Sequence, residues 1–216
     1  SYAKFGNYVT LPTRKNIGTD RGTPILYVID AMSAGGGPAV CYDLATGIDP
    51  SLFKPCIVTL FEKGELGERI EYEGIPILNL GVHRPFTIAS VIRYVPRIVA
   101  FARDQRVEIV HAHLVASGLY GFLAVLLLRV PCIFTAHGAM GKQRLLRLVE
   151  ICIRNLYTKV VAVSQDGADE TRRISLRNCS RVEFIRNGVN ANYWRAGAGD
   201  RKARDVFTIV MVANFF

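Results

Sequence analysis

The sequence predicts an α/β protein in which one Rossmann-like parallel β-sheet carries helices on both faces. Short β-rich runs alternate with longer helical stretches along the chain, which is the pattern of strands joined by crossover helices. Most of the β-rich runs are continuously apolar, as strands covered on both faces should be. The chain has 216 residues, 50% of them hydrophobic, so it is long enough to bury a full core.

The strands and helices are expected in alternation. The strands are expected at Ile25–Asp30, Phe53–Leu60, Ile75–Leu80, Val107–Ala112, Cys132–Ala136, Lys159–Val163 and Val182–Ile185. The helices are expected near residues 37–48, 65–73, 88–105, 115–128, 142–157 and 165–176. Pro96 lies inside the stretch 88–105, where its ring and its missing N–H predict a kink or a division into two short helices.

Changes in composition predict the domain boundaries. Residues 1–24 are polar and lack the continuous apolar region of a signal peptide, so we expect a tail there. The Rossmann-like domain is expected over residues 25–187. The Gly-rich and charged sequence of residues 188–205 predicts a linker. The apolar run within 206–216 is expected to be the first strand of a second domain, because a single strand cannot form a domain alone.

Cysteine content and hydropathy bear on the setting of the protein. The five cysteines are odd in number and scattered, which favours a reducing, cytoplasmic environment. The longest uncharged apolar stretch, Leu114 to Leu128, is shorter than the roughly 20 residues that a membrane-spanning helix needs. We therefore expect it to be a buried helix.

Charge is distributed unevenly along the chain. The whole sequence has 27 Lys/Arg and 18 Asp/Glu, whereas residues 1–75 have 7 and 9 of them, so the rest of the chain is strongly basic. This asymmetry indicates an anionic partner, such as membrane lipid, a phosphate-bearing substrate or nucleic acid, or else a merely solubilising surface. Arg144, Arg147 and Arg154 recur at helical spacing and predict a basic amphipathic helix that lies on anionic lipid or is simply solvated. The residues expected to pack on its other side are Leu145, Leu148, Val149, Cys152 and Leu156.

A second basic cluster argues against nucleic acid as the partner. No aromatic residues interleave with its arginines, so base stacking is not expected there. The cluster consists of Arg172, Arg173, Arg177 and Arg181.

A glycine loop follows the first expected strand. Gly35, Gly36 and Gly37 precede Pro38 and a helical stretch, so backbone N–H groups and the positive end of the helix dipole should point toward one place. A phosphate group would suit that place. The spacing is not G-x-G-x-x-G and no phosphate-loop Lys follows, which argues against dinucleotide and ATP sites. A purely structural tight turn is the alternative.

Three histidines fall at or beyond strand ends. His111 and His113 are two residues apart and should point to the same face of a strand, where they could converge on one ligand. No third ligand lies at a supporting spacing, so no metal is expected. His137 and Gly138 follow the next strand, in the kind of loop where open α/β sheets bind ligands. Structural, hydrogen-bonded histidines are the alternative interpretation for all three.

Taken in order, these segments resemble the amino-terminal domain of family-four glycosyltransferases, enzymes with two facing Rossmann-like domains (the GT-B fold). The resemblance begins with the glycine loop and continues through five further segments in the family's order. They are Glu108 leading into Ile-Val-His-Ala-His, Thr-Ala-His-Gly at 135–138, Val161–Ser164, Asn187–Trp194 and Thr208–Asn214. The chain departs from the family pattern at Pro38-Ala39, where Ala-Glu is frequent, and at Asn190, where Asp is usual.

The resemblance implies roles for individual residues. Gly36, Gly37 and Gly138 would bind the nucleotide-sugar donor, the first two at its diphosphate. His137 would contact the transferred sugar as the catalytic residue. His113 is assigned to the acceptor, and Asn187 and Gly188 to the hinge before the second domain. No metal or other cofactor is expected.

The resemblance also implies an activity. The parent enzyme would transfer a sugar from a nucleotide-sugar to a glycan or lipid-linked acceptor with retention of anomeric configuration. It would act in the cytoplasm, including at the inner face of the membrane. A polypeptide without the donor-binding domain is expected to be inactive alone. Two alternatives are a sugar-nucleotide epimerase of the same architecture and a non-catalytic module that binds an acceptor or a membrane.

Overall fold

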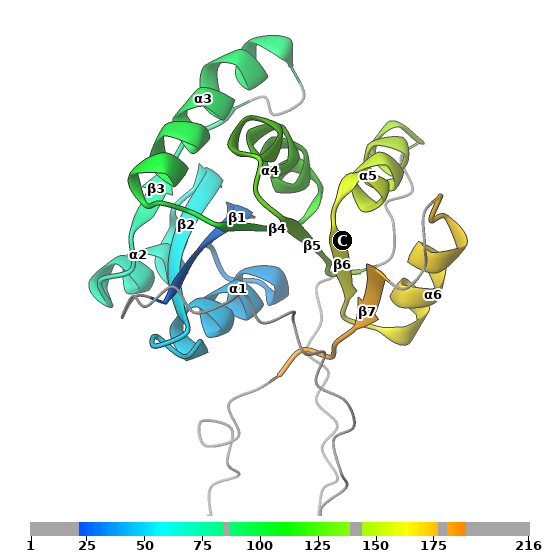
Figure 1. The fold of residues 1–216 in the computed structure, drawn as a ribbon, viewed down its shortest axis with the longest axis horizontal. Helices are drawn as coiled ribbons and strands as arrows, with labels where there is room; N and C mark the ends of the chain where they lie inside the picture. The colour runs from blue at the N-terminus through cyan, green and yellow to red at the C-terminus, as the bar shows by residue number, and fades with distance from the viewer. Residues whose placement is uncertain (1–21, 84–86, 139–143, 177–180, 189–216) are drawn as a thin grey trace, which may run out of the picture.

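Seven parallel strands form the centre of the protein. The structure is a computed structural model that describes residues 22–83, 87–138, 144–176 and 181–188. Within these residues the sheet order is β3-β2-β1-β4-β5-β6-β7, with every neighbouring pair parallel (Figure 1). The predicted Rossmann-like parallel sheet is therefore confirmed. The strands are β1 (Thr23–Ala31), β2 (Phe53–Glu62), β3 (Ile77–Asn79), β4 (Ile109–His113), β5 (Cys132–Ala136), β6 (Lys159–Ala162) and β7 (Val182–Phe184).

Two strands begin later than predicted, in both cases because backbone N–H groups before the strand donate to carbonyls at the end of the preceding helix. The N–H of Val107 donates to the carbonyl of Ala102 at the end of a helix, so β4 begins only at Ile109. The N–H of Ile75 donates in the same way to Ile70, and Pro76 has no N–H to donate. Strand β3 therefore begins at Ile77.

Helices occur at all six predicted places. They are α1 (Gly36–Gly47), α2 (Gly64–Tyr72), α3 (Ile88–Asp104), α4 (Val115–Leu128), α5 (Arg144–Leu156) and α6 (Gln165–Arg173). Helix α3 passes through Pro96 as one unbroken element, so the predicted division into two helices is wrong. Pro96 and Ile92, whose carbonyl loses its helical partner, both lie on the exposed side of α3, where water can hydrate that carbonyl.

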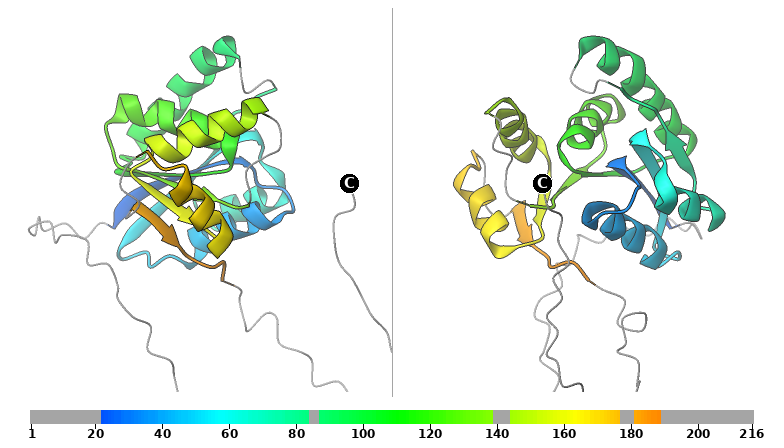
Figure 2. Two further views of the ribbon diagram at one scale, coloured as in Figure 1. Left: turned by 90° about the vertical axis from the view of Figure 1, so that its right-hand side faces the viewer. Right: turned by 180° about the vertical axis from the view of Figure 1, so that it is seen from behind.

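The helices cover both faces of the sheet, as predicted. Helices α3, α4 and α5 pack on one face, and α1 and α2 pack on the opposite face beside β1 and β2 (Figures 1 and 2). Side chains of β1 alternate between the two cores. Leu26 and Val28 belong to the larger core under α3–α5, whereas Tyr27 and Ile29 belong to the core under α1 and α2. Helix α6 packs on β6 and β7.

The strand order reverses between β1 and β4. From β1 the chain adds β2 and β3 on one side, then crosses over through α3 and adds β4 to β7 on the other. Loops that leave neighbouring strands in opposite directions open a crevice beyond the carboxyl ends of those strands. The glycine loop follows β1 and His113 ends β4, so both belong to this crevice.

Helix α5 packs on the sheet with a face that the sequence predicts only in part. Of the residues predicted to pack, Val149 contacts the larger core, whereas Cys152 is exposed, Leu148 is 60% exposed and Leu156 is 43% exposed. The helix instead buries Ile153 together with the charged pair Glu150 and Arg154. Arg154 is thus a core residue, and the predicted basic face of α5 is wrong at this position because an ion pair satisfies its charge.

Arg181 is also buried rather than part of a basic surface. Its guanidinium donates to the carbonyls of Arg154 and Asn155 at 2.9 and 2.8 Å, and to that of Tyr157 at 3.0 Å. These carbonyls lie at the end of α5, where a helix leaves its last carbonyls without partners and favours a cation. Arg181 therefore does not belong to the predicted second basic surface, Arg173 is exposed, and Arg177 lies outside the described residues.

The longest apolar stretch forms α4, which packs between α3 and α5 and buries half of its residues, including Tyr120 and Ala124. Leu126 and Leu127 remain 57% exposed, so burial is incomplete at its end. No helix in the described ranges is long and apolar enough to cross a membrane. Among the described cysteines, Cys41, Cys56 and Cys132 are buried free thiols, and Cys152 is an exposed one.

Candidate functional site

Three loops meet at the carboxyl edge of the sheet. The first carries Gly36 and Gly37 at the start of α1, the second follows His113 at the end of β4, and the third carries His137 after β5. A Cβ placed on Gly37 would lie 3.7 Å from two ring atoms of His137 and 3.8 Å from the Leu114 side chain. The His137 ring therefore lies directly beside the amino terminus of α1.

The loop that follows β2 packs against the backbone just before the glycine loop. Gly64 has φ +63°, and a Cβ there would lie 2.5 Å from the backbone of Met32 and Ser33. The N–H of Leu66 donates to the carbonyl of Met32 at 2.9 Å. Only glycine allows two backbones to approach this closely in that conformation. The sequence reasoning missed Gly64, and only its place after a strand could have indicated a role.

Asp30 at the end of β1 caps the helix that follows β4. Its carboxylate accepts hydrogen bonds from the backbone N–H of Ser117 at 2.8 Å and from the Ser117 hydroxyl at 2.6 Å. The N-cap position of α4, Leu114, makes no side-chain cap and has φ 71°, a conformation that disfavours side chains other than glycine. Burial raises the pKa of Asp30, and the two bonds from Ser117 oppose that rise. Asp30 thus fixes the strained turn beside His113.

The three histidines stack in a row on the side of the sheet that faces α1. The ring centroids of His111 and His113 are 4.4 Å apart, and those of His113 and His137 are 5.1 Å apart. His111 Nε2 hydrogen bonds the Thr135 hydroxyl at 2.7 Å, and His113 Nδ1 hydrogen bonds His137 Nε2 at 2.8 Å. Tyr27 lies tilted against His111 and His113.

Burial keeps the histidine row neutral. Desolvation lowers the pKa of His111 to about 3, with a smaller contribution from His137. Desolvation also lowers the pKa of His113 well below its ordinary value, and the neighbouring His111 and His137 add to this effect. Desolvation lowers the pKa of His137 too. At neutral pH each of these rings therefore carries one N–H and one lone pair.

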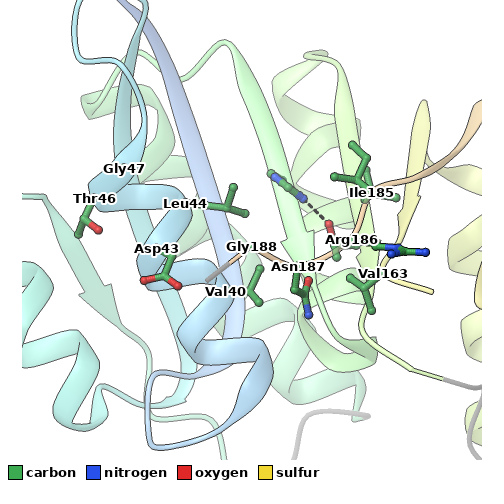
Figure 3. A pocket seen from close by; sticks show the side chains of 13 residues that line it. Val40, Asp43, Leu44, Thr46, Gly47, Val163, Ile185, Arg186, Asn187 and Gly188 are labelled. Carbon is green, nitrogen blue, oxygen red and sulfur yellow. Dashed lines mark hydrogen bonds between the residues drawn. The ribbon is translucent and has the colours of Figure 1, made fainter. Parts of the chain in front are cut away.

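A pocket of about 600 Å³ adjoins the histidine row (Figure 3). Helix α1 forms one wall with Val40 and Leu44, and the segment after β7 forms the facing wall. His111 and Thr135 also line the pocket, and the hydrogen bond between them is the dashed line in Figure 3. Asn187 and Gly188, the predicted hinge, belong to the second wall and not to the edge with Gly37 and His137.

Arg154 supports the loop that carries His137. Its side chain is 1% exposed and forms a buried ion pair with Glu150. It also donates to the Thr171 hydroxyl at 2.5 Å and to the carbonyl of Gly138 at 3.5 Å. One guanidinium thus joins α5, α6 and the loop after β5. The helical pattern had placed Arg154 on the surface, so sequence reasoning missed this support.

The predicted site residues separate into three environments. Gly37, His113 and His137 lie in one cluster. Gly36 and Gly138 are open, since a Cβ on either would meet no atom within 4 Å. Asn187 and Gly188 lie in the wall of the pocket. His113 is fully buried, so it can affect a ligand through His137 without touching the ligand itself. Among the described residues, no group of three or more His, Cys, Asp or Glu side chains could hold a metal ion.

A family model for "Glycosyltransferase Family 4" matches residues 34–193, which is more than half of the chain. The chain belongs to glycosyltransferase family 4. The matched range of this family-four chain includes the glycine loop, the histidine row and the segment after β7. No curated protein sequence matches the chain significantly.

Solved structures show the same fold at low sequence identity. HepE of Anabaena, in complex with UDP and glucose, has a TM-score of 0.68 and 16% identity over 82% of this chain and 47% of its own. A glycosyltransferase of Rickettsia africae has a TM-score of 0.62 and 20% identity over 80% of this chain and 45% of its own. The family-four chain thus has the fold of GT-B glycosyltransferases and spans about half the length of these proteins.

An epimerase shares this fold as well. The UDP-GlcNAc 2-epimerase of Neisseria meningitidis, bound to UDP-GlcNAc, has a TM-score of 0.52 and 14% identity over 75% of this chain and 45% of its own. Identities this low show a common fold only. The family assignment therefore rests on the family-model match.

Proposed function

We propose that this chain is the acceptor-side half of an enzyme that transfers a sugar from a nucleotide-sugar to an acceptor with retention of configuration. The observation that carries the proposal is the contact between the start of α1 and His137 at the switch point of the sheet. A Cβ placed on Gly37 would lie 3.7 Å from the His137 imidazole there. An anion-binding helix terminus and a neutral hydrogen-bond donor thus face one open place.

The chemistry of sugar transfer suits this arrangement. Negative charge grows on the nucleotide diphosphate as the sugar–phosphate bond breaks, and fixed N–H groups at a helix terminus stabilise such charge without reorganising. Gly36 and Gly37 would approach the diphosphate, and His137 would donate a hydrogen bond to an oxygen of the transferred sugar. A Cβ on Gly138 would meet no atom within 4 Å, so Gly138 would leave room for that sugar. No step of this scheme uses a metal ion.

Glycine substitutions test the proposal with little risk to folding. A Cβ on Gly36 meets nothing within 4 Å, so the Gly36→Ala protein should be as stable as the wild type. If the backbone of this loop approaches a diphosphate, the added methyl group should still weaken nucleotide-sugar use. Gly47→Ala is the matched control, because a Cβ there also meets no atom within 4 Å. Gly47 lines the pocket of Figure 3 but lies at the opposite end of α1 from the glycine loop.

The assay requires a polypeptide that continues in frame beyond Phe216 and includes a donor-binding domain. Nucleotide-sugars, with UDP-glucose first because HepE of Anabaena was solved with UDP and glucose, would be offered with and without acceptor extracts. Release of nucleotide diphosphate that falls in Gly36→Ala and His137→Ala but not in Gly47→Ala is the expected result. Equal activity in all four proteins would contradict the site. We expect the 216-residue chain to show no transfer alone.

Product analysis separates the alternatives. Transfer predicts a new glycosidic bond with the anomeric configuration of the donor, measured by the proton coupling of the product, whereas epimerisation predicts an altered nucleotide-sugar and no acceptor dependence. The epimerase stays a second candidate because the Neisseria meningitidis enzyme has the same fold. Binding of acceptor without any turnover would indicate the non-catalytic module.

We further propose that the acceptor is a glycan or a lipid-linked sugar met at the cytoplasmic membrane face. The support lies on α5, where Leu148 is 60% exposed and Leu156 is 43% exposed beside the exposed Arg147. Apolar and cationic side chains on one exposed helix suit an anionic lipid surface. Flotation with anionic liposomes should carry the wild type and lose Leu148→Ser/Leu156→Ser. Equal flotation with neutral liposomes would contradict the proposal.

A further inference from the structure

We propose that His113 fixes the protonated nitrogen of His137, so that His137 offers an Nδ1–H donor to its ligand and cannot act as a base through Nε2. His113 is therefore a buried positioning residue that acts through its hydrogen bond to His137. The claim about the proton stands on the structure alone, whereas its consequence for a sugar ligand rests on the proposed function.

The two rings meet nitrogen to nitrogen. His113 Nδ1 lies 2.8 Å from His137 Nε2, within ordinary hydrogen-bond distance. Two neutral imidazoles at this distance must share one proton, since a nitrogen of one ring donates only to a lone pair of the other. The arrangement thus has two forms. Either His113 Nδ1 donates to His137 Nε2, or the reverse.

The second nitrogen of His113 decides between these forms. His113 Nε2 is buried and has no hydrogen-bond partner among the described residues. If His137 donated, that nitrogen would have to carry the proton of His113, which would leave a buried N–H without an acceptor. Orphaned buried N–H groups are rarer in proteins than under-satisfied acceptors. The favoured form therefore has the proton of His113 on Nδ1, donated to His137, and a bare lone pair on Nε2.

The surroundings of His113 hold both rings neutral and in place. The titratable groups that face it are Tyr27 on β1, His111 on its own strand and His137 after β5, and none of them is a carboxylate. Desolvation keeps the pKa of His113 well below its ordinary value. A 180° turn of the His113 ring would move Nδ1 away from His137 and break their hydrogen bond, which holds the ring in this orientation.

A definite role for His137 follows. Its Nε2 lone pair is occupied by His113, so its single proton is on Nδ1. No described residue hydrogen bonds that nitrogen. A ligand of His137 must then present an acceptor oxygen, such as a sugar hydroxyl oxygen or a phosphate oxygen. His137 adds a hydrogen bond and not a full positive charge, and the favourable field for an anion comes from the start of α1.

Nitrogen-15 NMR of the imidazole rings tests the inference directly. The chain has four histidines, His83, His111, His113 and His137, so single His→Gln variants assign every ring. In the wild-type chain at pH 7.5 we expect His113 and His137 each to be protonated on Nδ1 and bare on Nε2. A proton on Nε2 of either ring, or a positive charge on either, would overturn the proposal.

Substitutions of His113 then test the coupling. In His113→Asn the side-chain amide can place an N–H where Nδ1 was, so His137 should stay in its Nδ1–H form. In His113→Leu that donor is lost, and we expect the Nε2–H form of His137 to become the major one. The matched control is His111→Gln, which changes the neighbouring ring without removing the donor, and His137 should keep its proton on Nδ1. An unchanged His137 in His113→Leu would refute the coupling.

The experiment separates this inference from the proposed function. The NMR measurements use the chain without any ligand, so they decide the tautomer whether or not the parent enzyme transfers a sugar. If His113→Leu fails to fold, the wild-type spectrum and His113→Asn still give the answer. In a two-domain enzyme, His113→Leu should lower the transfer rate about 10- to 100-fold, as losses of supporting hydrogen bonds do in metal sites. His113→Asn should recover most of that rate. An inactive wild type with the expected tautomers would count against the proposed function alone.

Discussion

Two regions of the protein bury polar side chains, and they do so in different chemical forms. Beside the central strands β4 and β5, the buried groups are imidazoles, which burial keeps neutral and which bond to one another and to Thr135. At the β6–β7 end of the sheet the buried groups are the guanidinium groups of Arg154 and Arg181, which bond to a carboxylate and to backbone carbonyls. The two regions therefore tolerate burial in opposite ways.

The difference has a physical cause. An imidazole loses its charge at modest cost because its ordinary pKa is near 6.5, whereas an arginine stays protonated and must be paired. The neutral row depends on pH and on which nitrogen holds each proton. The charged network depends on having every partner present. The first region can thus present a chosen donor to a ligand, and the second can hold helices in place.

Breaking the charged network should have the largest effect. Arg154→Met leaves the Glu150 carboxylate buried without its partner, and removing one member of a buried ion pair typically costs about 3–5 kcal/mol. Urea unfolding followed by circular dichroism would measure the loss. The double variant Glu150→Leu/Arg154→Met removes both charges and should recover much of that stability. A single variant as stable as the wild type would show that the ion pair is dispensable.

Acid should lower the free energy of unfolding through the neutral histidine row. Histidines with a lowered pKa in the folded state bind protons only after unfolding, so stability is complete above pH 6.5 and falls as pH decreases toward the folded value, about 3 for His111. Protonation of His111 in the unfolded state alone should lower the free energy of unfolding by about 2 kcal/mol at pH 5. Asp30, whose pKa is raised, opposes this trend weakly.

The His111→Gln variant provides the control for that pH dependence. Its amide can reach the Thr135 hydroxyl but does not titrate, so urea unfolding at pH 7.5, 6.5 and 5.0 should show a shallower loss than in the wild type. An identical slope in both proteins would mean that His111 is not held neutral by the fold.

The cap of α4 should have a smaller effect. Asp30→Ala removes the acceptor for the Ser117 N–H beside the histidine row, and losing an N-terminal cap costs about 1 kcal/mol. Asp30→Asn keeps a side-chain oxygen there and should lose less. Thermal melting of the three proteins at pH 7.5 would check this order, and a more stable Asp30→Ala would disprove the capping role.

The smallest effect is expected for an exposed arginine on the same helix as Arg154. Arg147 lies on the exposed side of α5, so Arg147→Gln should change the unfolding free energy by less than about 0.5 kcal/mol. Urea unfolding of Arg147→Gln and Arg154→Met under the same conditions would compare the two losses of stability. A large loss in Arg147→Gln would mean that the two arginines are not in the contrasting environments described above.

Much of the fold could be predicted because it depends on local pattern. Continuous apolar runs marked the seven strands, and Gly37 and His137 could be expected near one another because parallel strands bring their carboxyl ends to one edge. The packed face of α5 could not be predicted, since Glu150 and Arg154 count as exposed in any hydrophobic pattern. The bond between Asp30 and Ser117, 87 residues apart, requires knowing that β1 lies beside β4.

The same limit applies to the site. The pattern placed His111 and His113 on one face of a strand and His137 in a nearby loop, but the hydrogen bond from His113 to His137 depends on the register of β4 against β5. Gly64 was missed because a glycine after a strand gives no sign of which backbone approaches it. The assignments of Gly36, Gly37, Gly138, His113, His137, Asn187 and Gly188 to ligand and hinge roles remain predictions.

The lengths of the strands also affect how the protein behaves in concentrated solution. The outermost strands of the described sheet, β3 and β7, have 3 residues each, whereas β1 and β2 have 9 and 10. A long open edge invites pairing with another molecule, and natural proteins avoid this in part by keeping their edge strands very short. This sheet thus places its long, aggregation-prone hydrophobic strands inside and presents little free backbone for growth into fibrils.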